Sequence, residues 1–318
     1  MATREFTDEE IESLVRGLES LQGGPMTAAA LVGCGEKAIP PLRRFLLEGR
    51  PRGIFQPRQL AVETLAQLGA KDVLIEYLEK SPEIKDPVIR FGENTVISTT
   101  ARELGRWPTD DVFHCLMRVA LDRVLPGIVE TLGEFKHTEA VPYFLLALGD
   151  DVCRSNAEAA IRKLHDKARP FLIDAVNQPN PSGEDENPSS LRRRRCALRI
   201  LLDLRVAPSD WKSLRQCLDE NDPEIVITSA RIALEIESAP ERLYAVHRLI
   251  EMLPRVNWFL RDDARVALLT HFDISRDAVE AEIGRRKVAS ERDGRFDAVL
   301  RLLVNVRMRA LESRVERN

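Results

Sequence analysis

The residues best suited to chemistry are four consecutive arginines, Arg192, Arg193, Arg194 and Arg195. Guanidinium groups bind carboxylate and phosphate through paired hydrogen bonds, so this run could hold a nucleic acid, a phosphate or an acidic peptide. Acidic residues precede the run at positions 184–186 and allow a second interpretation. In it the arginines belong to a solvated helix start, and the acidic loop neutralises their charge. Arginines near a helix N-terminus oppose the helix dipole, which keeps the anion-binding hypothesis open.

The other reactive side chains form no familiar catalytic or metal-binding pattern. The five histidines are scattered, and the motifs HExxH, GxSxG and GxGxxG and the Walker loop do not occur. Cys34 lies between Gly33 and Gly35, but no histidine close in sequence supports a nucleophilic role. The five cysteines contain no CxxC pair and are predicted to be small core residues. We therefore predict no catalytic, cofactor-binding or metal-binding residues, although the sequence leaves enzymatic activity open.

Composition predicts a helical protein without a membrane span. The chain has 318 residues, of which 44% are hydrophobic, 31% charged and 5% aromatic. Its many Leu, Ala, Arg and Glu residues lose little entropy in a helix. The longest apolar stretch, residues 141–148, is far shorter than the roughly 20 residues that cross a bilayer. The acidic start lacks the features of a signal peptide, so we expect a cytoplasmic protein.

A repeated helical pattern runs through the chain. Segments such as Ala38-Ile39-Pro40 and Ala140-Val141-Pro142 place a proline in a first helical turn, where its missing N–H had no partner. Apolar residues follow two and six positions later and share one helix face. The pattern predicts second helices about 34 residues apart, starting at Pro40, Asp72, Asp110, Pro142, Pro170, Lys212, Tyr244 and Asp277.

Each second helix is preceded by another helical segment. Leu68-Gly69, Leu104-Gly105 and Leu132-Gly133 each close an apolar run, as expected where Gly takes the left-handed conformation past a helix end. Asp72 and Asp110 then fit the first turn of the next helix. One helix pair cannot bury its apolar face alone, so successive pairs must stack.

Two insertions, residues 81–94 and 177–190, interrupt the period. The second is polar and predicts a loop or disordered excursion. It separates N-terminal repeats, residues 1–176, from C-terminal repeats, residues 191–318, of one continuous solenoid. A capping box at Thr7 and Glu10 predicts an N-terminal capping helix. Apolar spacing from Phe296 onward predicts a final helix over residues 296–315.

Residues 132–154 carry the most specific form of the repeat. Here Leu132-Gly133 is followed by Ala140-Val141-Pro142, then Leu148-Gly149, then Asp150-Asp151-Val152-Cys153-Arg154. This series resembles the HEAT-repeat superfamily, in particular the short bacterial repeats also found in phycobilin-lyase-like proteins. The resemblance covers roughly residues 25–285. It implies an all-α fold, an α-α superhelix of about eight two-helix repeats, and it implies little about activity.

Solenoids of stacked helix pairs bind extended partners along a row of exposed helices. In this chain the second helices, expected on the concave face, offer Arg43, Arg44 and Tyr77, which we predict to bind a partner together with the arginine run. The expected function is a non-catalytic scaffold or adaptor. Mixed surface charge and a net charge of −4 favour a protein partner over a nucleic acid.

Two alternatives stay open. The first is nucleic-acid or other anion binding through the run Arg192 to Arg195. The second is a HEAT-like enzyme of the bilin-lyase or DNA-alkylation glycosylase type. Such glycosylases use tryptophans and an acid in a basic groove, and Trp107 and Asp110 would be the matching residues. Asp110 also has an explanation that needs no catalysis, because an acidic side chain at a helix start stabilises that helix.

Overall fold

The computed structural model describes residues 6–81, 84–182, 185–236, 240–293 and 297–315. Within these ranges the chain forms 18 α-helices, five short 3₁₀ helices and one hairpin of two-residue strands, so the predicted all-α class is confirmed. None of the helices in these ranges is long and apolar enough to cross a membrane.

First and second helices alternate along the chain, between one capping helix at each end. The first helices are α2 (Gly24–Gly33), α4 (Gln56–Gln67), α6 (Pro87–Leu104), α8 (Pro126–Phe135), α10 (Arg154–Arg162), α12 (Pro188–Leu204), α14 (Pro223–Glu235) and α16 (Trp258–Thr270). The second helices are α3 (Ile39–Leu47), α5 (Lys71–Glu79), α7 (Asp110–Ala120), α9 (Val141–Leu148), α11 (Arg169–Val176), α13 (Pro208–Leu214), α15 (Arg242–Met252) and α17 (Phe272–Asp293). The capping helices are α1 (Asp8–Gly17) and α18 (Ala298–Val315).

Short 3₁₀ helices lie beside several second helices, where the chain turns tightly. They are η1 (Gly35–Ala38), η2 (Thr138–Ala140), η3 (His165–Ala168), η4 (Arg215–Asp219) and η5 (Leu253–Arg255).

The second helices start close to the predicted positions. The five up to α11 begin within one residue of the expected start, because proline or a first-turn acid marks each of them. The last three begin earlier than expected. At α13 the first residue is Pro208, and at α17 only His271 separates the helix from α16, so no turn signal marks that boundary.

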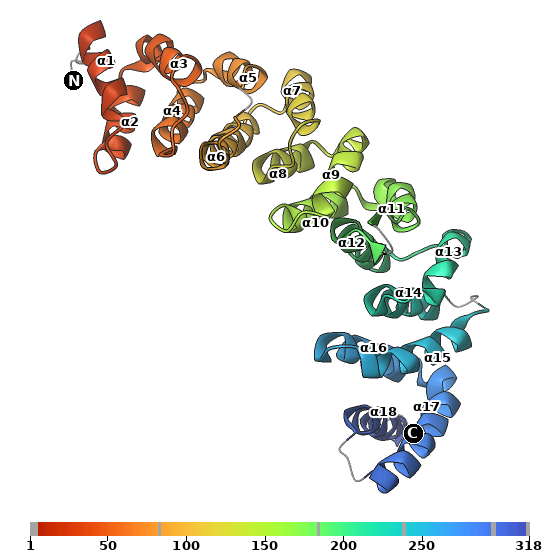
Figure 1. Cartoon of the computed structure of the whole chain (residues 1–318). Helices are drawn as coiled ribbons and strands as arrows, with labels where there is room; N and C mark the ends of the chain where they lie inside the picture. Colours follow the sequence, from red (N-terminus) through yellow and green to blue (C-terminus); the bar gives the residue numbers. More distant parts are fainter. Residues whose placement is uncertain (1–5, 82–83, 183–184, 237–239, 294–296, 316–318) are drawn as a thin grey trace. The chain divides into compact units, whose positions relative to one another are not determined.

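The chain divides into two compact units, Met1–Leu164 and His165–Asn318. In the first unit, α2, α4, α6, α8 and α10 contact one another in order and form one row, and α3, α5 and α7 contact in order in a second row (Figure 1). In the second unit, α12, α14 and α16 contact in order, as do α15 and α17. Each helix therefore packs mainly on its neighbours along the chain.

Small residues in the first helices allow this close stacking. Ala61, Ala101 and Ala160 are buried in the first unit, and Ala197 and Ala230 are buried in the second. The role predicted for Gly133 is wrong, because α8 continues through it and ends at Phe135, where Lys136 takes the left-handed conformation with φ 57°. Gly105 follows the end of α6 as predicted, but its φ of −57° is right-handed, whereas Gly69 is left-handed with φ 76°. A Cβ at Gly133 would lie 2.8 Å from the Cβ of Ala160, so this glycine lets α8 and α10 approach.

Both predicted insertions are more regular than expected. In the first, α6 begins at Pro87, because the Asp86 carboxylate caps the N–H groups of Val88 and Ile89. In the second, strands β1 (Pro181–Ser182) and β2 (Asp185–Glu186) pair antiparallel. The Asn187 N–H donates to the Asn180 carbonyl at 2.8 Å and helps to close this hairpin.

The predicted N-terminal capping helix and its capping box are confirmed. The Glu10 carboxylate accepts from the Thr7 N–H at 2.9 Å, and the Thr7 hydroxyl accepts from the Glu10 N–H, which forms the expected capping box. At the other end the predicted final helix corresponds to α18. Phe296, the predicted first residue of its apolar face, lies outside the described residues, as does Glu184 of the acidic loop.

Candidate functional site

The arginine run lies in the first turns of α12 and is bound by the protein itself. Arg194 is only 4% exposed. Its Nε donates to the Val176 carbonyl at 2.6 Å, and its terminal nitrogens pair with Glu186 and Glu220. The predicted partner-binding role of Arg194 is therefore corrected, because its guanidinium is buried and already engaged by the chain's own acceptors.

The neighbouring arginines are engaged as well. Arg195 pairs with Asp222 and, at 3.5 Å, with Glu224. Arg193 donates to the Gln178 carbonyl at 2.9 Å, and Arg192 is half-buried and also has a partner. The run joins the polar segment before α12 to the start of α14. Acids from the segment 185–186 and from the turn before α14 supply the counter-charge.

Arg43 and Arg44 belong to a series of ion pairs between neighbouring helices of the first unit. The Arg43 guanidinium binds Glu76 across α3 and α5 at 2.5 Å, and Arg44 binds Glu12 of α1. The Arg43 hydrogen bond, followed by that of Lys80, holds the pKa of Glu76 at about 2. The same pattern continues to α7 through Lys71–Asp111 and Arg118–Glu79. These predicted site residues thus have carboxylate partners within the unit.

Tyr77 faces the interior instead of a partner. It is 2% exposed, and its hydroxyl donates to the Glu93 carboxylate at 2.6 Å. Arg58, also buried, binds the same carboxylate with two hydrogen bonds of 2.9 and 3.1 Å. Burial and the Glu93 charge raise the pKa of Tyr77 well above its usual value. The prediction that Tyr77 contacts a partner is corrected, because α5 turns this side toward α4 and α6.

Within the described ranges, the remaining candidate residues are not grouped into a catalytic or metal-binding site. Cys115, Cys153, Cys196 and Cys217 are buried, as predicted, whereas Cys34 is half-buried and departs from that prediction. Burial raises the pKa of Cys217 to about 12, so this thiol stays protonated. Asp110 is exposed in the first turn of α7. Among the described residues, no group of three or more His, Cys, Asp or Glu is placed to hold a metal ion.

A different feature of the first unit is a series of exposed aliphatic residues. One lies in or beside each turn that joins a second helix, or α1, to the next first helix. Their exposures lie between 58% for Ile54 and 83% for Leu121. They recur about once per helix pair, at Leu21, Ile54, Val88, Leu121 and Val152. We call this row of turns the inter-pair edge.

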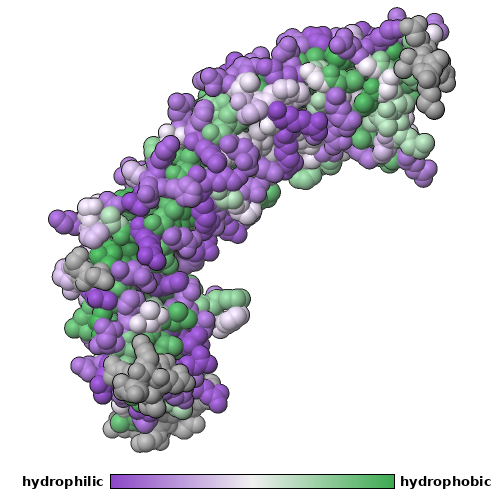
Figure 2. All heavy atoms as spheres, turned by 180° about the vertical axis from the view of Figure 1, so that it is seen from behind, coloured by the Kyte–Doolittle hydropathy of each residue, from purple (hydrophilic) through white to green (hydrophobic). Residues whose placement is uncertain are grey.

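The geometry of the fold brings these turns to one side of the unit. Each exposed aliphatic residue precedes or begins a first helix, and the first helices lie side by side in order. Phe91, also exposed, packs its ring against Phe55 at 6.5 Å between ring centroids and extends the apolar surface from α4 to α6. On the face seen in Figure 2, polar side chains predominate and apolar side chains occupy separate areas between them.

Two hollows open at the inter-pair edge. The smaller, about 260 Å³, lies beside the turn between α3 and α4 and has Phe45, Ile54 and Pro57 in its lining. The larger, about 770 Å³, lies between the turn before α6 and the turn after α7. Each hollow combines apolar side chains with three basic ones and one acidic one, which are Arg50, Arg52, Arg58 and Glu19 in the smaller and Lys85, Arg90, Arg123 and Asp122 in the larger.

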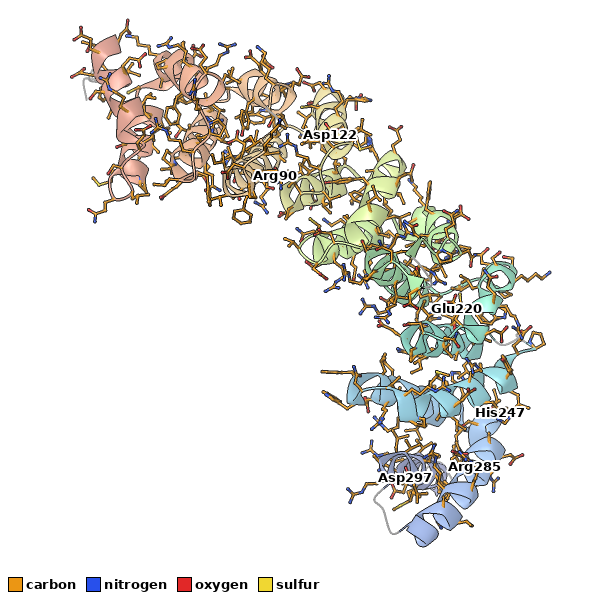
Figure 3. The ribbon with its side chains drawn as sticks, viewed as in Figure 1. Arg90, Asp122, Glu220, His247, Arg285 and Asp297 are labelled. Atoms are coloured by element: carbon orange, nitrogen blue, oxygen red, sulfur yellow. The ribbon has the colours of Figure 1, made fainter. Side chains whose placement is uncertain are left out.

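Several of these cations have no carboxylate partner among the described residues. Arg52 pairs with Glu19 and Arg58 with Glu93, but Arg50, Lys85 and Arg90 make no ion pair within those ranges. Figure 3 shows Arg90 on α6 and Asp122 in the turn after α7, on neighbouring helix pairs. Elsewhere in the unit, basic side chains tie adjacent helices together. The unpaired cations of the edge therefore remain available to an external acid.

Sequence reasoning did not find this edge. Its residues lie in turns, where periodicity carries no information about exposure, and each is unremarkable alone. The only usable signal was an aliphatic residue two positions from an arginine in some of these turns, as in Arg52-Gly53-Ile54 and Leu121-Asp122-Arg123.

Comparisons with known proteins add no assignment: no family model matches the chain, and no curated protein matches it.

Proposed function

We propose that this protein is a non-catalytic scaffold of HEAT-like helix pairs that binds an extended segment of a partner protein. The periodicity of the helix pairs and the resemblance of residues 132–154 support the HEAT-like assignment. Repeat arrays of this kind offer long surfaces on which several partner residues are read in series. The binding surface we assign is the inter-pair edge of the first unit, in place of the row of second helices.

The observation that carries the proposal is the coincidence of exposed aliphatic residues and unpaired cations along one edge. An apolar side chain of the partner gains free energy by covering Ile54 or Leu121, since each leaves water on contact. An acidic side chain of the partner can pair with Arg50 or Arg90, which make no ion pair within the described residues, although the Asp122 carboxylate lies in the same hollow as Arg90. The preferred partner segment is thus extended, with acidic and aliphatic residues in alternation.

The arginine run does not favour the nucleic-acid alternative. Phosphate binding needs accessible cations, and Arg194 and Arg195 are held by Glu186, Glu220 and Asp222. A phosphate would have to displace these carboxylates from partly buried positions.

The test selects random peptides displayed on phage with the immobilised full-length chain and measures the affinity of the enriched peptides. We expect enrichment of acidic and aliphatic residues. The double variant Arg50→Glu/Arg90→Glu should weaken the best peptide at least tenfold, and Ile54→Asp should weaken it comparably, since about 1.4 kcal/mol corresponds to tenfold.

The matched control is Lys37→Glu, an exposed cation in η1 between α2 and α3, away from the inter-pair edge. It should leave the affinity unchanged. Enrichment of basic peptides, absence of enrichment, or equal effects of Lys37→Glu and Arg90→Glu would each refute the assignment.

A further inference from the structure

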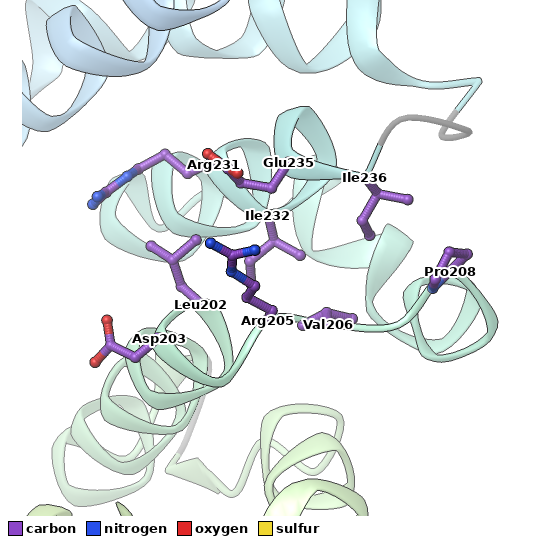
Figure 4. Close-up of a pocket in the computed structure, with 9 residues that line it drawn as sticks. All are labelled: Leu202, Asp203, Arg205, Val206, Pro208, Arg231, Ile232, Glu235 and Ile236. Atoms are coloured by element: carbon purple, nitrogen blue, oxygen red, sulfur yellow. The ribbon is translucent and has the colours of Figure 1, made fainter. Parts of the chain in front are cut away.

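A hollow of about 630 Å³ opens in the second unit, beside the turn that joins α12 to α13. Its volume falls within the roughly 300–1,000 Å³ usual for small-ligand sites. The side chains of Leu202, Val206, Ile232 and Ile236 supply apolar wall from α12, from the turn and from α14, as Figure 4 shows. Such walls suit a ligand with an aliphatic body.

Arg205 reaches into this hollow from a strained backbone. Its φ is 59° and its ψ is 118°, a conformation that glycine adopts easily and that strains other residues. The Arg205 N–H closes the turn by donating to the Leu202 carbonyl at 3.3 Å, a contact that any residue except proline could make. The turn itself therefore gives no reason for an arginine at this position.

The Arg205 side chain is exposed and has no hydrogen bond or ion pair with the described residues. Figure 4 shows its guanidinium extending from the turn toward α14, beside Ile232. An arginine that contacts no carboxylate within the described ranges, above an apolar wall, is placed to bind an anionic group from outside the protein.

The other charges of the lining are already engaged. Arg231 pairs with Asp263 at 3.1 Å, and Glu235 lies 3.6 Å from the Nε2 of His271. Asp203 also has a partner. Because the carboxylates of Asp203 and Glu235 lie in the same lining, a ligand with two negative charges would be repelled. The hollow thus favours a single negative charge.

We propose that this hollow binds a monocarboxylate with an aliphatic body, with the carboxylate on the Arg205 guanidinium and the body against Ile232 and Ile236. Two sources share this chemistry, a free aliphatic acid and the C-terminal residue of a peptide that ends in Leu or Ile. The site lies in the second unit and does not depend on the function proposed for the inter-pair edge.

The experiment measures binding to the full-length chain by calorimetry with four probes: octanoate, octan-1-ol, and a peptide ending in Leu with either a free or an amidated C-terminus. We expect octanoate or the free peptide to bind, and octanol and the amidated peptide to bind at least tenfold more weakly. Which acid binds identifies the source. Arg205→Met, which retains an unbranched apolar stem, should reduce the affinity at least tenfold.

Two further variants separate binding from folding. Arg205→Gly should abolish binding while raising the midpoint of thermal unfolding, because glycine relieves the positive φ. Arg276→Met, at an exposed cation of α17 outside the hollow, should change neither quantity. The proposal fails if no acid binds, if octanol binds as well as octanoate, if Arg205→Met binds normally, or if Arg205→Gly lowers the unfolding midpoint.

Discussion

Arg58, Glu93 and Tyr77 form a buried polar cluster between α4, α5 and α6. Each guanidinium nitrogen of Arg58 donates a hydrogen bond, two of them to Glu93 and one to the Gly49 carbonyl at 3.2 Å. Tyr77 donates to Glu93 and lies under the guanidinium, 5.7 Å from ring centroid to Cζ. A buried pair of this kind stabilises little over apolar residues, but removing one partner leaves an uncompensated charge.

We therefore expect Glu93→Gln to destabilise the first unit by about 3–5 kcal/mol, the usual cost of breaking a buried ion pair. Tyr77→Phe should cost about 1–2 kcal/mol, because only one hydrogen bond to the carboxylate is lost. Urea unfolding followed by circular dichroism measures both. Glu130→Gln is the control, since its pair with Arg102 is about half-exposed and should contribute below about 1 kcal/mol. A Glu93→Gln effect no larger than this control would contradict the prediction.

At the scale of helices, two glycines have opposite roles. Gly127 lies in the first turn of α8, where an added Cβ would meet the Ser98 carbonyl oxygen of α6 at 2.1 Å. Gly284 lies inside α17, and no atom of the described part of the chain lies within 4 Å of its added Cβ. The close approach of the α6 and α8 backbones thus requires glycine at position 127. The described contacts do not require glycine at position 284.

Gly127→Ala should accordingly destabilise the protein by about 1–3 kcal/mol, as overpacking does when backbone must move. Gly284→Ala should stabilise it by up to about 1 kcal/mol, because alanine is the better helix former. Thermal unfolding of the two variants beside the parent chain provides the comparison. Stabilisation of both variants would show that helix propensity, and not contact between α6 and α8, decides the outcome.

The junction of α17 and α18 depends on two carboxylates around Arg286. Glu282 binds Arg285 and Arg286, and these hydrogen bonds, that from Arg285 foremost, lower its pKa. Burial raises the pKa of Asp297, but the Leu300 N–H and Arg286 outweigh it and the pKa is lowered. Carboxylates with lowered pKa stabilise the folded state above their ordinary pKa and lose that contribution as the pH falls.

We expect the stability difference between the parent chain and Arg286→Met to be full at pH 6–7 and to shrink below about pH 5, where these carboxylates begin to protonate. Unfolding midpoints of both proteins between pH 3 and pH 7 test this. A difference that stays constant, or grows toward low pH, would show that the two carboxylates do not carry the contribution of Arg286.

At the scale of the whole molecule, each helix packs on its neighbours along the chain, and the described contacts group into two compact units. Stability in such arrays is approximately a sum of local and nearest-neighbour contributions, so a local defect spreads only a short way.

Glu93→Gln should therefore accelerate amide hydrogen exchange in α4, α5 and α6, and less in α8. Exchange in α14 to α18 should remain as in the parent chain. Mass spectrometry of peptic fragments resolves these regions. Equal acceleration in α16 would mean that the chain unfolds as one cooperative body, contrary to this expectation.

Much of the architecture was determined by the sequence alone. Apolar residues four apart, prolines in first turns and the capping box at Thr7 act within a few residues of one another, so α1 and the starts of the second helices from α3 to α11 could be placed before any tertiary contact was considered. The start of α6 at Pro87 was missed, because it lies in a predicted insertion. The same local rules failed at Gly133, where the partner that demands a glycine is Ala160 on the next first helix.

Only the tertiary structure decided which charged and aromatic groups are accessible. Tyr77 and Arg194 looked exposed by position but meet Glu93 and Glu220, residues distant in sequence that packing brings to hydrogen-bonding distance. Arg205 and the inter-pair edge show the converse, since a side chain is unpaired only when every neighbouring element has been placed. Helix formation depends on local spacing, whereas burial and pairing depend on contacts between elements, and for that reason the sequence determined the fold class while the structure determined the candidate sites.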